Sequence, residues 1–194
     1  MLSSNAAFVI LAFGLVFGQG DGLRLFNTRA THGLLGPDRT EDRVFPGDQY
    51  WVAFDIEGVR ADPLGHVSYT MAMDLTNSEG KVIYSQDPRN LDAVNSLGGT
   101  RMQGFTYIQV GLRQPAGEYT INVTFTDRTS KAVQTLHKKF EVAPADFGLV
   151  GLALFADPDG RIPAPPQGVT GQPLTVMVSA VGFRATPRAS SQTW

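Results

Sequence analysis

The stretch Leu112-Arg-Gln-Pro-Ala-Gly-Glu-Tyr119-Thr-Ile-Asn-Val123-Thr-Phe-Thr-Asp127 decides the fold class. After a turn that contains Pro and Gly, apolar residues return at every second position, at Tyr119, Ile121, Val123 and Phe125. Successive residues of a β-strand point to opposite faces, so this period of two places the four side chains on one face. The stretch therefore predicts a turn followed by a strand with one face in a core.

The same alternation recurs on both sides of this stretch. Apolar residues occupy every second position, with few exceptions, in residues 50–56, 67–75, 81–84, 104–112 and 136–142. The segment Asn77-Ser-Glu-Gly80 predicts a tight turn, and residues 87–100, which are polar and rich in Gly, predict a long loop. No apolar stripe with a helical period follows residue 20. Short alternating strands at this spacing predict an all-β, antiparallel sandwich.

The opening stretch also resembles a known structural corner. In bacterial immunoglobulin-like and fibronectin type III-like domains a Leu ends one strand, a Pro and Gly turn follows, and a Tyr opens the next strand. Leu112 and Tyr119 match these positions, and residues 126–131 are similar to the turn that follows the second strand. The resemblance covers about residues 23–142 and implies that residues 21–143 form an immunoglobulin-like β-sandwich domain, in which the Tyr119 hydroxyl bonds to the upstream backbone. The Cys and Trp set of the family is missing, so the resemblance implies a fold and no function.

Part of the pattern occurs twice. Residues 47–60 align without a gap with residues 171–184, and residues 23–26 resemble residues 152–155. Identical residues in the longer alignment are Gly47 and Gly171, Val52 and Val176, Gly58 and Gly182, and Arg60 and Arg184. Residues 144–194 are therefore predicted to hold the first strands of a second, incomplete immunoglobulin-like domain with a coil tail.

Three explanations fit an incomplete second domain. The chain is a fragment of a longer protein with several modules, or its reading frame was lost near Arg184. In the third, the two strands dock on the exposed sheet edge of another chain, since unpaired strands offer free backbone hydrogen-bonding groups. The fragment is the favoured explanation, because two strands alone bury no sandwich core.

The first twenty residues have the pattern of a signal peptide. An apolar run over residues 6–17 precedes the small residues Gly18 and Gly20, which suit a cleavage site. The run is short for a membrane span of about 20 residues, so no stable membrane insertion is expected after cleavage. A buried first strand or helix is the alternative. The signal peptide predicts an extracytoplasmic location, whether periplasmic, cell-surface or secreted.

Composition excludes several function classes. The chain has no Cys, which removes disulfides, thiolate nucleophiles and Cys-ligated zinc. Secreted eukaryotic immunoglobulin domains usually carry a disulfide, so its absence favours a bacterial source. A formal net charge of −2 gives no basic face for nucleic acid.

No catalytic residues, metal ligands or cofactor are predicted. The three histidines are far apart and have no metal-binding spacing, and no nucleophile elbow or phosphate loop occurs. They are His32, His66 and His137. Asp157-Pro-Asp-Gly160 lacks the further oxygens of a calcium loop and favours a turn. The acidic cluster of Asp38, Glu41 and Asp42 favours a solvated loop over a cation site.

Three aromatic residues are the candidate binding site. If Tyr50, Val52 and Phe54 face the core, Trp51 points outward, together with Phe105 and Tyr107. These three form a candidate platform for a sugar ring or a partner protein, unless a loop or the next domain covers it.

The sequence thus predicts a non-catalytic structural spacer or protein-interaction and adhesion domain of a larger exported protein. The alternative is a carbohydrate-binding module that is accessory to a secreted hydrolase and binds, for instance, a cell-surface polysaccharide.

Overall fold

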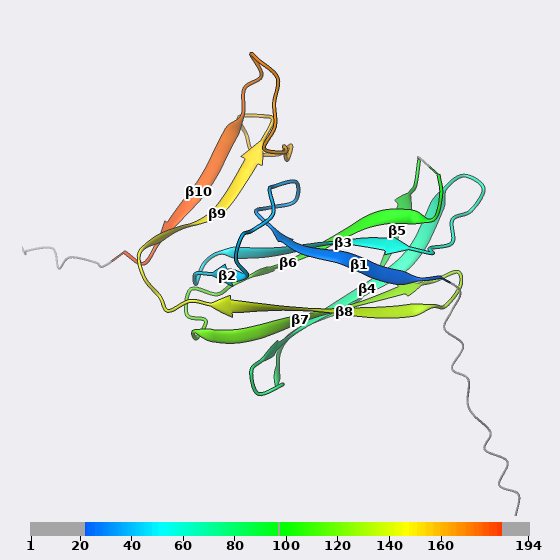
Figure 1. Ribbon diagram of the computed structural model, residues 1–194, viewed down its shortest axis with the longest axis horizontal. Helices are drawn as coiled ribbons and strands as arrows, with labels where there is room; N and C mark the ends of the chain where they lie inside the picture. The colour runs from blue at the N-terminus through cyan, green and yellow to red at the C-terminus, as the bar shows by residue number, and fades with distance from the viewer. Residues whose placement is uncertain (1–21, 97, 184–194) are drawn as a thin grey trace, which may run out of the picture.

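A computed structural model of the protein describes residues 22–96 and 98–183, which form ten strands and no helix (Figure 1). The signal peptide predicted at residues 1–20 and the coil tail at residues 185–194 lie outside this range. The strands are β1 (Arg24–Thr31), β2 (Arg43–Val44), β3 (Gln49–Glu57), β4 (His66–Asn77), β5 (Val82–Val94), β6 (Arg101–Gln109), β7 (Gly117–Asp127), β8 (Val133–Val142), β9 (Gly148–Phe155) and β10 (Thr175–Val181). The all-β prediction is confirmed for these residues.

Two sheets face each other across one core. The smaller has the strand order β1-β3-β6, and the larger has the order β2-β8-β7-β4-β5. The core draws Tyr50 and Phe54 from the smaller sheet and Ile121 and Phe125 from the larger, and all four are fully buried. Burial of one such side chain stabilises the fold by about 1.5–3 kcal/mol, which explains why the alternating residues decide the strands.

One prediction was wrong in the larger sheet. Residues 87–100 were expected to form a loop, but β5 continues to Val94 and pairs with β4 along almost its whole length. Asp87 and Pro88 fall at a shift of register, where a Pro is tolerated because β5 is an edge strand. Most of β5 is exposed, so no apolar alternation marks it in the sequence.

A purely antiparallel fold was expected, and this part of the prediction was also wrong. After β1 the chain crosses to the other sheet, where the two residues of β2 pair with β8 in parallel. The backbone N–H groups of Glu141 and Ala143 donate to the carbonyls of Asp42 and Val44 at 2.8 Å. Since β2 arrives by a crossing rather than by a hairpin, its direction is not set by the neighbouring strand.

The strands β9 and β10 form a separate two-stranded sheet that stands off one end of the two facing sheets (Figure 1). They pair in the same register as β1 and β3. Arg24 is opposite Glu57 in one pair, and Gly148 is opposite Val181 in the other, each 124 residues later. The register shifts after Phe26 in β1 and at the corresponding place, after Val150, in β9.

Two glycines repeat the same close approach of the backbone. Gly58 and Gly182 have φ angles of 81° and 76°, in the left-handed region. A Cβ atom on Gly58 would lie 2.1 Å from the Gly22 carbonyl oxygen, and one on Gly182 would lie 2.1 Å from that of Asp146. Each glycine thus follows the second strand of its pair and lies against the residue two positions before the first strand.

This correspondence corrects part of the alignment made from sequence. The alignment that pairs residues 47–60 with residues 171–184 has the offset that the strands show. Residues 23–26, however, correspond to residues 147–150 rather than 152–155. The shift of register inside β1 and β9 changes the phase of the alternation, so similar letters beyond it matched the wrong segment.

Candidate binding surfaces

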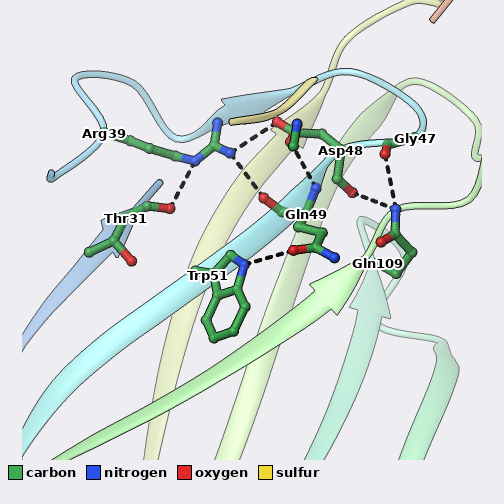
Figure 2. A network of polar contacts seen from close by, with 8 residues as sticks. Thr31, Arg39, Gly47, Asp48, Gln49, Trp51 and Gln109 are labelled. Carbon is green, nitrogen blue, oxygen red and sulfur yellow. Dashed lines mark hydrogen bonds and ion pairs between the residues drawn. The ribbon is translucent and has the colours of Figure 1, made fainter. Parts of the chain in front are cut away.

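A buried ion pair holds the start of β3 (Figure 2). The Arg39 guanidinium lies 3.0 Å from the Asp48 carboxylate, and both side chains are only 8% exposed. The same guanidinium donates to the backbone oxygens of Thr31 and Gln49. These contacts therefore attach the segment between β1 and β2 to the start of β3.

The same network orients the aromatic surface and reaches the β9–β10 sheet. The Trp51 indole N–H donates to the Gln49 side-chain oxygen at 3.1 Å, as Figure 2 shows. The Gln109 amide donates to the carbonyls of Gly47 and Asp48 and so ties the end of β6 to β3. The second Asp48 oxygen accepts the Gly151 N–H at 2.8 Å. Asp48 thus links the two facing sheets to β9.

The three predicted aromatic residues lie together on the outer face of the smaller sheet. Trp51 is directly opposite Tyr107, and Phe105 is opposite Ala53, on the neighbouring strands β3 and β6. The Trp51 and Tyr107 rings stack on each other, with centroids 4.4 Å apart and an angle of 19° between the planes. Each ring covers one face of the other, so the pair forms a stack rather than a flat platform. Phe105 and Tyr107 remain about half exposed.

Tyr119 stands at the start of β7 and is buried. Its hydroxyl donates to the Pro115 carbonyl oxygen at 2.8 Å, which is the bond expected for a tyrosine corner. Its ring packs near that of Phe140 in the core. Tyr119 therefore has a structural role at the turn before β7.

A groove of about 720 Å³ opens between the edge strands β5 and β6. Its inner wall consists of core residues of β4, β7 and β8, among them Leu75 and Phe140. Its outer walls are Tyr84, Arg89 and Leu91 on β5 and a continuous run of residues, 105–111, on and after β6. Because both in-facing and out-facing residues of this run line the groove, the backbone edge of β6 itself borders it.

The β9–β10 sheet presents a second apolar surface, which we call the hairpin face. Directly opposite residues of an antiparallel pair share a face. The pairing of Val176 with Leu154 and of Ala180 with Leu149 therefore places these side chains together. The members of the hairpin face are Leu149, Leu154, Val176, Val178 and Ala180. Leu149 is 67% exposed and Val176 is 58% exposed, although both lie in strands.

The histidines take separate, local partners. His66 Nδ1 lies 3.1 Å from the Asp62 carboxylate, and His137 Nδ1 lies 2.6 Å from the Asn122 side-chain oxygen. Burial, and then the nearby Arg39 charge, lower the pKa of His32, and Asp48 opposes this shift. Within residues 22–96 and 98–183, no group of three His, Cys, Asp or Glu side chains could hold a metal ion.

The acidic motifs serve turns and strand contacts. The Asp157 carboxylate accepts the backbone N–H groups of Arg161 and Ile162, as in a closed turn. Asp42 accepts the Tyr50 hydroxyl at 2.7 Å and pairs with Lys138 at 2.6 Å.

Among the residues that the structure describes, there is no helix long and apolar enough to cross a membrane.

The sequence did not reveal the groove or the exposure of the hairpin face. The groove depends on β5, which has no apolar alternation, and on the unequal number of strands in the two sheets. The alternation of β10 predicted the strand correctly, but no local pattern shows whether another sheet covers a strand. The only available signal was the incomplete second domain.

Comparisons with known proteins give no family. No protein-family model and no curated protein matches the sequence. Among solved structures, the sporulation control protein Spo0M from Bacillus subtilis has a TM-score of 0.40 at 12% identity, over 73% of this chain and 64% of that one. The CARDB domain of a Pyrococcus furiosus protein, in complex with two metal ions, has a TM-score of 0.36 at 10% identity, over 62% of this chain and 93% of that one.

A family 123 glycoside hydrolase from Clostridium perfringens has a TM-score of 0.39 at 13% identity. The match covers 52% of this chain and 22% of the hydrolase. The present chain therefore spans less than a quarter of that protein. Proteins of such different kinds at these TM-scores indicate no particular activity.

Proposed function

We propose that this chain is a non-catalytic, immunoglobulin-like domain of an exported protein that acts as a spacer or as a protein-interaction and adhesion domain. Two facing sheets around one core and the hydrogen bond from Tyr119 to Pro115 support the immunoglobulin-like assignment. The signal-peptide pattern of residues 1–20 supports an extracytoplasmic location.

One observation carries the interaction role, namely the exposed hairpin face. A soluble protein rarely leaves a contiguous apolar strand surface uncovered, and such surfaces mark contacts with other proteins. The hairpin face contains no charged residue, and within the described part of the chain the outer edge of β10 is free for further backbone hydrogen bonds. A polypeptide strand or sheet matches both properties, whereas a small polar ligand matches neither.

The ionisable groups inside the fold support a non-catalytic role. Asp127 is fully buried and accepts the backbone N–H groups of Arg60, Thr129 and Ser130. Burial raises its pKa, but these hydrogen bonds outweigh burial and hold the pKa below the usual value. Burial and the hydrogen bond to Asp42 raise the pKa of Tyr50. Each of these groups is committed to contacts that hold the fold.

The correspondence between β9–β10 and β1–β3 supports a second domain that begins near Phe147. The two pairs share register, the place of the register shift and the glycine that follows. In the first domain the equivalent of the hairpin face is Tyr50, Val52, Phe54 and Ile56, all of which lie in the core. The hairpin face therefore has the pattern of a core face, which supports the proposal that it packs against another sheet.

Carbohydrate binding is the second candidate. The half-exposed rings of Phe105 and Tyr107, next to each other on β6, favour it, because sugars bind on the faces of aromatic rings. The stacking of Trp51 on Tyr107 weakens it, since that contact removes one face of each ring.

A glycan array with the purified chain tests the two candidates against each other. The proposal predicts no saturable binding to any polysaccharide. A matched pair of variants, Trp51→Ala on the outer face and Phe183→Ala at an exposed aromatic residue elsewhere, gives the control. Saturable glycan binding that is lost in Trp51→Ala, kept in Phe183→Ala and accompanied by an unchanged melting temperature would replace the interaction role with carbohydrate recognition.

A further inference from the structure

We propose that β10 of one copy of this protein adds to the free edge of β6 in a second copy, with the hairpin face turned into the groove between β5 and β6. The inference rests on the interaction role proposed above and names its partner as another copy of the same chain. The groove and the hairpin face both lie in the described part of the chain.

The groove lies where the described smaller sheet has no further strand to pack over β5. The smaller sheet has three strands and the larger has five, and β1 lies against β8. In the part of the chain that the structure describes, no strand of the smaller sheet therefore covers β5, at the far end of the larger sheet. Tyr84 and Leu91 of β5 are opposite the core-facing residues Leu75 and Tyr69 of β4, so they share the inward face. They line the groove instead of a closed core.

The edge of β6 can accept a strand. The Val110 N–H donates to the Asp48 carbonyl, and the Gly47 N–H donates to the Val110 carbonyl, so Val110 directs its backbone groups toward β3. Backbone groups alternate in direction along a strand, and the pairing of β6 with β3 has no shift of register. Phe105 and Tyr107 therefore direct their N–H and C=O groups off the free edge. These groups border the groove and suit a ladder with an added strand.

The strand β10 has the properties of the added strand. Its seven residues contain no charged residue and no Pro, which are the features that normally prevent edge pairing. Among residues 22–96 and 98–183, β9 is the only strand that pairs with β10, so the other edge of β10 is free there. Val176 and Val178 are about half exposed and lie at alternate positions on the hairpin face. In the groove they would contact apolar side chains of β5 and the core.

The correspondence between β10 and β3 gives the direction of the contact. β3 takes β6 on the edge opposite β1, and the free edge of β10 is likewise the one opposite β9. With the hairpin face toward the core, this edge can meet the outer edge of β6 only if β10 runs parallel to β6. The contact joins two different surfaces. Each copy therefore has one hairpin face that enters a groove and one groove that receives a hairpin face, so the copies can form chains.

Two variants test the hairpin face and the groove separately. Val178→Lys places a charge on the hairpin face, and Tyr84→Lys places one in the groove, at positions that are both about half exposed. Val169→Lys and Leu64→Lys add the same charge at highly exposed residues outside these surfaces and serve as controls. Thermal melting of all four shows that each variant keeps the fold.

Sedimentation velocity over about 1 μM to about 1 mM then measures association, a range that covers a thousandfold change in Kd. We expect concentration-dependent oligomers from the wild type and from both controls, and monomers from each of the two test variants alone. An equimolar mixture of Val178→Lys and Tyr84→Lys should form dimers that grow no further, because one intact hairpin face meets one intact groove.

Three results overturn the proposal. A monomeric wild type at all concentrations excludes the second copy as the partner, and leaves the interaction role to be decided by the glycan array and by other proteins. Association that Tyr84→Lys does not weaken excludes the groove. A mixture that stays monomeric, although the wild type associates, shows that the hairpin face and the groove do not bind each other.

Discussion

Two regions of this molecule pair their strands in the same way and differ in what covers them. The strands β1 and β3 share register, bulge and following glycine with β9 and β10. Phe54 of the first pair is fully buried, whereas Val178, 124 residues later, is 48% exposed. Local residues thus determine how two strands pair, but burial of their apolar face depends on a second sheet that only the first pair has.

The largest expected difference between the regions comes from truncating these two equivalent side chains. Phe54→Ala removes a ring from the filled core and should lower the free energy of unfolding by about 3–5 kcal/mol. Val178→Ala removes an exposed side chain and should change it by less than about 0.5 kcal/mol. Denaturant unfolding at low protein concentration measures both. Similar losses from the two variants would show that the hairpin face is covered within one chain.

A smaller effect is expected from Asp127, a fully buried carboxylate at the end of β7 in the larger of the two facing sheets. The folded pKa of Asp127 is lowered, so its contribution to stability is present above the ordinary carboxyl pKa and is lost as the pH falls through the folded value. Asp127→Asn should cost about 1.5–3 kcal/mol at neutral pH, because charged hydrogen-bond acceptors are lost, and should cost less in acid.

Urea unfolding of the wild type and of Asp127→Asn between pH 7 and pH 2 checks this prediction. Glu79→Gln serves as a control, since Glu79 is exposed in the turn between β4 and β5. A loss of stability that is the same at every pH would assign the role of Asp127 to shape rather than to charge.

Substitution of the two glycines should destabilise different parts of the molecule. Gly58→Ala forces a Cβ into the Gly22 carbonyl at positive φ and should lower the free energy of unfolding of the facing sheets by about 1–3 kcal/mol. Gly182→Ala makes the same clash with Asp146 but should leave that free energy nearly unchanged. Hydrogen exchange should then become faster only in β9 and β10. Global destabilisation by Gly182→Ala would mean that the two regions unfold as one unit.

The sequence predicted the strands that contribute alternating side chains to the core, such as β3 and β7, because burial imposes the period of two. It failed for residues 87–94 of β5, whose exposed edge position places no demand on these residues, and for β2, whose two residues are too few to show a period. The aromatic residues Trp51, Phe105 and Tyr107 were placed on the correct face by phase alone. Their stacking was not predictable, because it depends on the register between β3 and β6.

The groove and the hairpin face lie beyond what a local pattern can give. Whether a strand is covered depends on how many strands each sheet receives and in which order, and these are properties of the whole chain. The alternation of Val176, Val178 and Ala180 predicts a face suited to a core. Their exposure became visible only with the two-stranded sheet that carries them.

Hydrogen exchange of the wild-type chain at low and at high concentration tests the central claim most directly, because it follows β3, β6 and β10 in one experiment. At low concentration the account predicts slow exchange in β3 and fast exchange in β10. At high concentration the amides of β10 and the free-edge amides of β6, including Phe105 and Tyr107, should become protected together. Slow exchange of β10 at every concentration, or protection of β10 without β6, would contradict the account.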